Sequence, residues 1–137
     1  MVNLSSAELR RILGDRYESV VDKPSKYGNK KVELDGYVFD SKLEAKRYAE
    51  LCMLVRAEHL LDVLVHTPTI RFRGTSITYT LDFMVLGKDG KVWCEDVKGM
   101  LTKAWRIKWK MARAQHPELD LRYLVRDRET WAIKMDV

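Results

Sequence analysis

Two neighbouring stretches decide the fold: ITYTLDFMVL at residues 77–86 and KVWCEDVKG at residues 91–99. Both are rich in apolar, aromatic and β-branched residues, and the turn sequence GKDG at 87–90 joins them, so we expect two antiparallel strands. Each strand carries an aspartate, Asp82 or Asp96. If both aspartates point to the same face, they lie side by side, and Lys98 shares that face.

Alternation assigns the remaining side chains of these strands to faces. On the first strand, Asp82 lies opposite an apolar row of Ile77, Tyr79, Leu81, Phe83 and Val85. On the second strand, Asp96 and Lys98 lie opposite Glu95. We therefore take Asp96, and not Glu95, as the partner of Asp82.

Two carboxylates on apolar strands predict metal-assisted phosphodiester hydrolysis. Partly desolvated carboxylates are costly unless they hold a cation. Mg²⁺ prefers carboxylate oxygens and water, lowers the pKa of a bound water and neutralises charge on a phosphate. Lys98 would orient the attacking water or stabilise the developing negative charge. The alternative is an Asp96–Lys98 ion pair with Asp82 standing alone.

Glu44 is a third candidate acid. It lies four residues before Tyr48 and continues the apolar stripe of the helix expected over 41–58, which places it toward the sheet. Ser41 and Glu44 also have capping-box spacing, in which the Glu44 carboxylate returns to the Ser41 backbone N–H. Both roles stay open at this point.

The 137 residues predict one α/β domain with a central mixed sheet flanked by helices. We expect an N-terminal helix within 1–22, a basic loop over 23–31, a core over 32–126 and a C-terminal segment over 127–137. Within the core, the patterns predict a hairpin over 31–39, strands over 61–65, 69–72 and 119–125, and a second helix over 102–115.

The charge distribution points to a polyanion. The formal net charge is +5, and residues 98–113 hold six basic residues and no acid. We expect the second helix to place its apolar stripe in the core, with the two tryptophans 105 and 109 as core, dimer surface or stacking platform. That stripe is Ala104, Ile107, Met111 and Ala114. The candidate DNA-binding residues are Lys26, Lys30, Lys31, Lys103, Arg106, Lys110 and Arg113.

Other classes are disfavoured by composition. Hydrophobic residues make up 46% and charged residues 33%, typical of a globular protein, and no apolar run is long enough to span a membrane. The two cysteines predict reduced thiols in a cytoplasmic protein. We expect no membrane partner and no organic cofactor.

Glu44, Asp82 and the motif Asp96-Val97-Lys98 resemble the PD-(D/E)xK nuclease superfamily, over most of the chain from about residue 26 to 125. The chain is also similar to small bacteriophage-encoded nucleases and to archaeal-type Holliday junction resolvases. It departs from the superfamily pattern at Leu81, where the motif name has proline, and at 66–68 (His-Thr-Pro), near which many relatives have glutamine.

The resemblance implies a restriction-endonuclease-like domain that depends on Mg²⁺, with Mn²⁺ able to substitute. It implies Asp82 and Asp96 as metal ligands, Lys98 as a catalytic residue and Glu44 as the helix acid. It further implies a homodimer that nicks opposed strands of a four-way DNA junction, in recombination or repair in a prokaryotic cell or a phage-infected host.

Three alternatives stay open from the sequence. The first is a sequence-specific or end-directed endonuclease with the same metal site. The second is a basic DNA-binding module without catalysis, whose acids are only ion-paired. The third is an RNA substrate, because no motif in the sequence indicates whether the protein distinguishes RNA from DNA by the 2′-hydroxyl.

Overall fold

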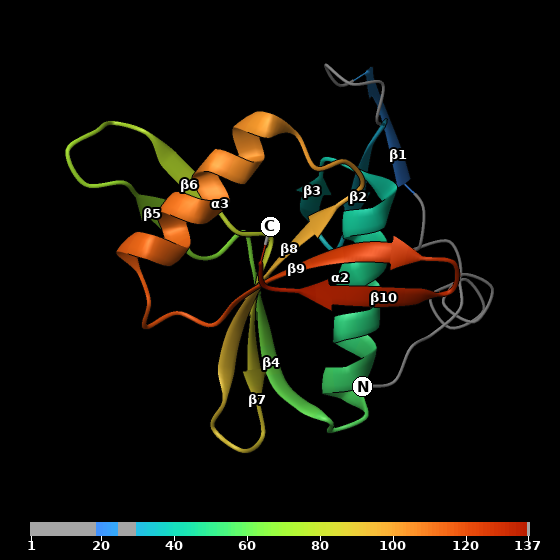
Figure 1. Cartoon of the computed structure of the whole chain (residues 1–137). Coiled ribbons are helices and arrows are strands. Elements are labelled where there is room, and N and C mark those ends of the chain that lie inside the picture. Colours follow the sequence, from blue (N-terminus) through green and yellow to red (C-terminus); the bar gives the residue numbers. More distant parts are fainter. Residues whose placement is uncertain (1–18, 25–29, 137) are drawn as a thin grey trace.

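A computed structural model of the chain describes residues 19–24 and 30–136. Three sheets and two helices make up this part of the protein (Figure 1). The elements in chain order are β1 (Ser19–Pro24), β2 (Lys30–Leu34), β3 (Tyr37–Phe39), α2 (Lys42–Arg56), β4 (Leu60–Val65), β5 (Thr69–Arg71), β6 (Thr78–Thr80), β7 (Phe83–Gly87), β8 (Val92–Lys98), α3 (Lys103–Gln115), β9 (Leu121–Asp127) and β10 (Thr130–Lys134).

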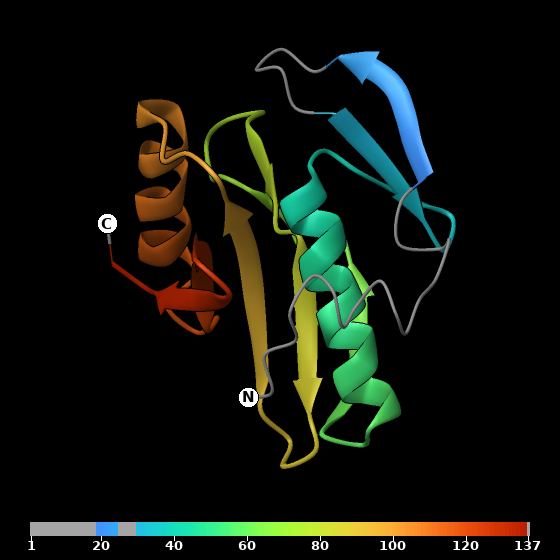
Figure 2. The same cartoon turned by 90° about the vertical axis from the view of Figure 1, so that its right-hand side faces the viewer.

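The central sheet has five strands in the order β10-β9-β8-β7-β4. β8 and β9 are parallel, because α3 connects them as a crossover helix, and the other neighbours are antiparallel. Figure 2 shows α2 and α3 on opposite sides of this sheet. The expected α/β domain with a mixed sheet flanked by helices is therefore confirmed.

The α2 side of the sheet holds one core. Phe83, Val85 and Val97 point from the sheet to this side and pack with Tyr48 and Leu51 of α2. Strands β2 and β3 close the same core. Asp35 and Gly36 join these two strands with φ values of 53° and 83°, as a two-residue hairpin turn requires. This core fixes α2 against the ends of β7 and β8.

The α3 side of the sheet holds a second core. Trp105 and Trp109 of α3 pack against Tyr123 of β9, with ring centroids 5.0 and 5.4 Å from the tyrosine ring. The hairpin of β5 and β6 extends beside α3 (Figure 1) and adds Phe72 and Tyr79 to this core. Together the two cores cover both faces of β7 and β8.

The prediction of one continuous strand over 77–86 is wrong. The chain leaves β6 at Thr80 and begins β7 at Phe83, and the two strands belong to different sheets. The predicted apolar row is divided by this break: Tyr79 packs on the α3 side, whereas Phe83 and Val85 pack on the α2 side. Asp82 lies in the break.

The prediction of the core-facing stripe on α3 is wrong at three of its four residues, whereas Met111 is half-buried and packs against the core. Ile107 is 53% exposed, and Ala104 and Ala114 are exposed as well. The buried residues are Trp105, Trp109 and Ala112, at spacings of four and three. The two large indoles bury more apolar area than the smaller residues of the predicted stripe. Their burial therefore favours the orientation of α3 in which Trp105 and Trp109 face the core. Of the three roles left open for the two tryptophans, the structure shows the core role.

The N-terminal predictions are corrected in part. β1 occupies Ser19–Pro24 and pairs with β2, where the sequence predicted the end of a helix and the start of a basic loop. The loop over 23–31 is also shortened by β2, which begins at Lys30. The expected N-terminal helix otherwise lies outside the described residues. At the other end, β10 adds an edge strand to the central sheet.

None of the helices in the described part of the chain is long and apolar enough to cross a membrane.

Candidate active site

Asp82 lies between β6 and β7, next to the end of β8. Its backbone N–H donates to the Glu95 carbonyl at 3.0 Å, and the Val97 backbone N–H donates to its Oδ2 at 2.7 Å. Burial raises the pKa of Asp82 well above its ordinary value, and the charges of Asp96 and Glu44 raise it further. Asp82 is half-buried and lies close to other negative charge.

Asp96 projects from β8 and is 4% exposed. Its Oδ1 lies 3.5 Å from the Nζ of Lys98. Its Oδ2 accepts a hydrogen bond from the Trp105 indole Nε1 at 2.8 Å and another from the Tyr79 hydroxyl. The structure thus brings Asp82, Asp96 and Lys98 together, as the sequence predicted.

Glu44 stands in the first turn of α2 and caps it. Its backbone N–H donates to the Ser41 Oγ at 3.2 Å, which is the capping contact expected from the sequence. The return contact differs from the prediction, because the Glu44 carboxylate accepts from the Asp40 backbone N–H at 3.3 Å and not from Ser41.

The pKa of Glu44 is raised by burial and by neighbouring acids. Burial, followed by the nearby charge of Asp40, raises its pKa from 4.5 to about 7, and Asp96 adds to this rise. The Glu44 carboxylate therefore accepts a hydrogen bond at the start of α2 and also lies near the charge of Asp96.

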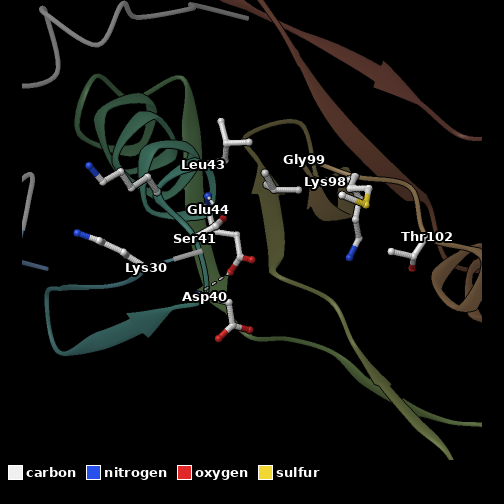
Figure 3. Close-up of a pocket in the computed structure, with 11 residues that line it drawn as sticks. Lys30, Asp40, Ser41, Leu43, Glu44, Lys98, Gly99 and Thr102 are labelled. Carbon is white, nitrogen blue, oxygen red and sulfur yellow. Dashed lines mark hydrogen bonds between the residues drawn. The ribbon is translucent and has the colours of Figure 1, made fainter. Parts of the chain in front are cut away.

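A cavity of about 590 Å³ opens between the N-terminus of α2 and the end of β8. Figure 3 shows Glu44 on its α2 side and Lys98 on its β8 side. Lys98 connects the cavity with the acid pair, because it lines the cavity and also contacts Asp96. Asp40, Gly99 and Thr102 contribute further to the wall. A phosphate group in this cavity would meet the Lys98 ammonium beside Asp96.

Glu95 points away from this site, as expected. On the α2 face of the sheet, Arg47 binds it in a two-pronged ion pair at 2.7 and 2.8 Å, and the Trp93 indole donates to it at 2.8 Å. Arg47 and Glu95 are both fully buried. Because its oxygens are occupied by these donors, Glu95 has a structural role, and Asp96 is the acid of β8 that lies beside Lys98.

The donor set suits a hard cation. In residues 19–24 and 30–136, no three Asp, Glu, His or Cys side chains form a group that could hold a metal ion by themselves. Asp82 and Asp96 give a pair of carboxylates, and Mg²⁺ typically takes one or two carboxylates and keeps several waters. The residues fit Mg²⁺ with water in the remaining positions, and they do not fit a zinc site built from protein ligands alone.

Six of the seven predicted DNA-binding residues lie in the described part of the chain, and they divide into three groups. Lys103, Arg106 and Lys110 are exposed on the outer face of α3. Arg113 is occupied instead, because it donates to the Met135 carbonyl at 2.8 Å and pairs with Asp136. Near the cavity, Lys30 is exposed and Lys31 lies 3.7 Å from Asp40, whereas residue 26 is outside the described residues.

Sequence reasoning missed two residues that contact the site. Tyr79 was assigned to the face opposite Asp82, and Trp105 was not connected with Asp96, yet both bind the Asp96 carboxylate. A buried aspartate needs donors, and tyrosine and tryptophan are apolar residues that carry one, which is the signal available in the sequence.

Residues 24–131 match a family described as a protein of unknown function, DUF1064. The chain belongs to this family. The match to DUF1064 spans Glu44, Asp82, Asp96 and Lys98, as well as Tyr79 and Trp105. Neither the curated proteins nor the solved structures contain a match to this DUF1064 chain.

Proposed function

We propose that this protein is a metal-dependent endonuclease that hydrolyses phosphodiester bonds in DNA. The observation that carries the proposal is the meeting of a buried aspartate, Asp96, and a half-buried one, Asp82, with a lysine at the end of β8. A buried pair of like charges is unfavourable in a protein without a ligand, and a bound cation relieves it. Structural ion pairs elsewhere in the chain, such as Arg47 with Glu95, are already neutralised without a metal.

Each residue has a proposed role. Asp82 and Asp96 hold Mg²⁺, or Mn²⁺ in its place, which supplies an acidified water and neutralises charge on the phosphate. Lys98 orients the attacking water or stabilises the developing charge from the cavity side. Glu44 completes the site directly or through water, and with its pKa at about 7 it can exchange a proton near neutral pH.

The surface around the cavity supports nucleic acid as the substrate. α3 begins five residues after Lys98, and its exposed Lys103, Arg106 and Lys110 lie on one face without an intervening acid. Such a stripe neutralises successive phosphates and directs a backbone toward the site. Arg113 is left out of this surface because it binds the C-terminal segment.

The finer assignments rest on the resemblance to PD-(D/E)xK nucleases. We propose that the core formed by α2, β4, β7, β8, α3 and β9 is of the restriction-endonuclease-like type. We further propose branched DNA as the substrate, with a homodimer making paired nicks at a four-way junction. A homodimer fits this reaction, because paired nicks on opposed strands need two coordinated sites.

The test of the site uses two variants and one matched control. Asp82→Asn and Lys98→Met are expected to lower DNA cleavage by 100-fold or more, while DNA binding in EDTA stays near that of the wild type. Lys91→Met is the control, because Asp89-Gly90-Lys91 repeats the acid-x-lysine spacing at the turn between β7 and β8, where Lys91 is 77% exposed. This control is expected to cleave as the wild type does.

Two results would overturn the site assignment. Unchanged cleavage by Asp82→Asn would remove Asp82 from the reaction. Binding of DNA by the wild type, with no product in Mg²⁺ or Mn²⁺, would leave the chain as a DNA-binding module whose acids are only ion-paired.

A further inference from the structure

We propose that Trp105 and Tyr79 are positioning residues that hold one oxygen of Asp96, so that only its other oxygen is presented to a divalent cation. This inference rests on the proposed function, because it assumes that Asp96 is a metal ligand. It assigns a role to two residues that line neither the cavity nor the exposed basic face of α3, although Trp105 contacts Thr102 and Lys98 of the cavity wall.

Trp105 contacts Asp96 and Lys98 at the same time. Its indole Nε1 donates to Asp96 Oδ2 at 2.8 Å, while the Lys98 Nζ lies 5.4 Å from the centre of its ring. An ammonium near an aromatic face is attracted to it electrostatically. One side chain therefore fixes both the carboxylate and the ammonium of the Asp96-Val97-Lys98 motif.

Tyr79 adds a second donor to the same oxygen. Its hydroxyl donates to Asp96 Oδ2 and accepts from the Trp105 indole N–H at 2.9 Å, so this N–H is shared between Tyr79 and Asp96. Tyr79 is 6% exposed, so water hardly competes for its hydroxyl. The break between β6 and β7 makes this contact possible, because it brings Tyr79 to the α3 side of the sheet.

The surroundings hold Trp105 in one place. Its backbone N–H donates to the Thr102 Oγ at 3.2 Å, which caps α3 in the same turn. Its ring packs on Trp109 at 5.3 Å and on Tyr123 at 5.0 Å between centroids. Trp105 is 6% exposed, so its donor points at Asp96 and water does not compete for it.

The two aspartates are arranged alike. The Val97 backbone N–H binds one oxygen of Asp82, as Trp105 and Tyr79 bind one oxygen of Asp96. In each carboxylate the protein therefore binds one oxygen by hydrogen bonds, while the Oδ1 of Asp96 forms an ion pair with the Lys98 ammonium at 3.5 Å. Outer donors of this kind orient metal ligands, and their loss typically weakens metal affinity or activity by about 10- to 100-fold.

The experiment measures Mn²⁺ affinity directly, from the free-ion signal in electron paramagnetic resonance without DNA. Trp105→Phe keeps an aromatic ring and loses the N–H donor, and Tyr79→Phe loses only the hydroxyl. Each variant is expected to bind Mn²⁺ several-fold more weakly than the wild type. The double variant is expected to bind it at least about 10-fold more weakly.

Trp109→Phe is the matched control. Trp109 lies one turn further along α3 in the same aromatic cluster, and its indole donates to the Met135 carbonyl at 2.9 Å and not to Asp96. This variant is expected to keep the wild-type affinity for Mn²⁺. Melting temperatures in EDTA show whether all variants are folded, and a folded Tyr79→Phe protein alone suffices for the comparison.

The outcomes separate this inference from the proposed function. If the double variant binds Mn²⁺ as tightly as Trp109→Phe while the wild type cuts DNA, the positioning role is wrong and the nuclease stands. If the double variant binds Mn²⁺ weakly and the wild type cuts no nucleic acid, the positioning role stands and the nuclease is wrong. Absence of Mn²⁺ binding by the wild type would overturn both.

Discussion

At the scale of single residues, the acids of the site are held at a cost to stability. Asp82 and Glu44 both have pKa values above their ordinary ones because they are buried beside other carboxylates. A group whose pKa is raised in the folded state binds more protons there than in the unfolded chain. For Glu44, these two pKa values are 4.5 in the unfolded chain and about 7 in the folded protein. The free energy of unfolding of the metal-free protein therefore falls as the pH rises from 4.5 to about 7.

We predict that replacing Asp82 by asparagine stabilises the metal-free protein. At pH 8 in EDTA, Asp82→Asn should raise the unfolding free energy by on the order of 1 kcal/mol, or about 4 °C in melting temperature. At pH 5 the difference should shrink, because wild-type Asp82 is then closer to neutral. Urea unfolding at pH 5, 6, 7 and 8 measures this. A variant less stable than the wild type at pH 8 would show that Asp82 is a structural ion-pair partner.

The acids and the lysine of the candidate site could largely be predicted from the sequence, whereas the side chains that donate hydrogen bonds to these acids could not. The proximity of Asp82 to Asp96 and the orientation of Glu95 away from them agree with the prediction, although Asp82 lies in the break between β6 and β7 and not on a continuous strand. Tyr79 was placed on the wrong face because the pattern of residues 77–86 carries no visible interruption. Arg47, which neutralises Glu95, lies 48 residues away in sequence, and no local pattern connects them.

At the scale of elements, α3 shows why a helix face was misassigned. Ala104, Ile107, Met111 and Ala114 recur at helical spacing, and so do the two tryptophans with Ala112. Periodicity alone does not choose between two overlapping stripes. The larger buried area of the indoles decides the outcome, and Ile107 is left 53% exposed among basic residues.

This exposure predicts the effect of a lysine at position 107. Ile107→Lys should change the unfolding free energy by no more than about 0.5 kcal/mol, because the side chain stays in water. The same lysine in Ala112→Lys, at a site with 0% exposure, should cost several kcal/mol. Chemical denaturation compares the two. A large loss of unfolding free energy for Ile107→Lys would show that residue 107 is part of the core.

The same variant tests the basic face of α3 in the proposed nuclease. If this face contacts phosphates, Ile107→Lys should tighten DNA binding and increase the slope of log affinity against log salt by about 0.9. Fluorescence anisotropy in EDTA over a series of salt concentrations gives this slope. An unchanged slope would place the DNA elsewhere on the protein.

At the scale of the whole molecule, the mixed sheet and most of the order of elements after β1 followed from the sequence because they depend on local signals, whereas β1 lies where the sequence predicted the end of a helix. Turn residues at 35–36 and 87–90 and the periodicity of two helices were enough to predict the α/β domain. The separate β5–β6 hairpin was not predictable in the same way, because its division from β7 depends on packing against α3, far away in sequence.

The candidate site lies at the end of β8, where the main parts of the molecule come together. Both cores converge on β8, the two aspartates meet near its end, and the cavity opens between that end and α2. The sheet thus provides a rigid support, and the helices provide the cap, the positioning tryptophan and the basic face. We interpret this arrangement as a nuclease in which the fold keeps a costly pair of acids ready for a cation.

The most direct test of this claim is a cleavage assay with the wild-type protein on an end-labelled four-way DNA junction and on a linear duplex of the same arm sequence, each with Mg²⁺ and with EDTA. We expect paired cuts near the branch point that require Mg²⁺, with the duplex left intact. Equal cutting of both DNAs would keep the metal site and remove the junction as its substrate. An absence of cutting in both Mg²⁺ and Mn²⁺ would contradict the claim.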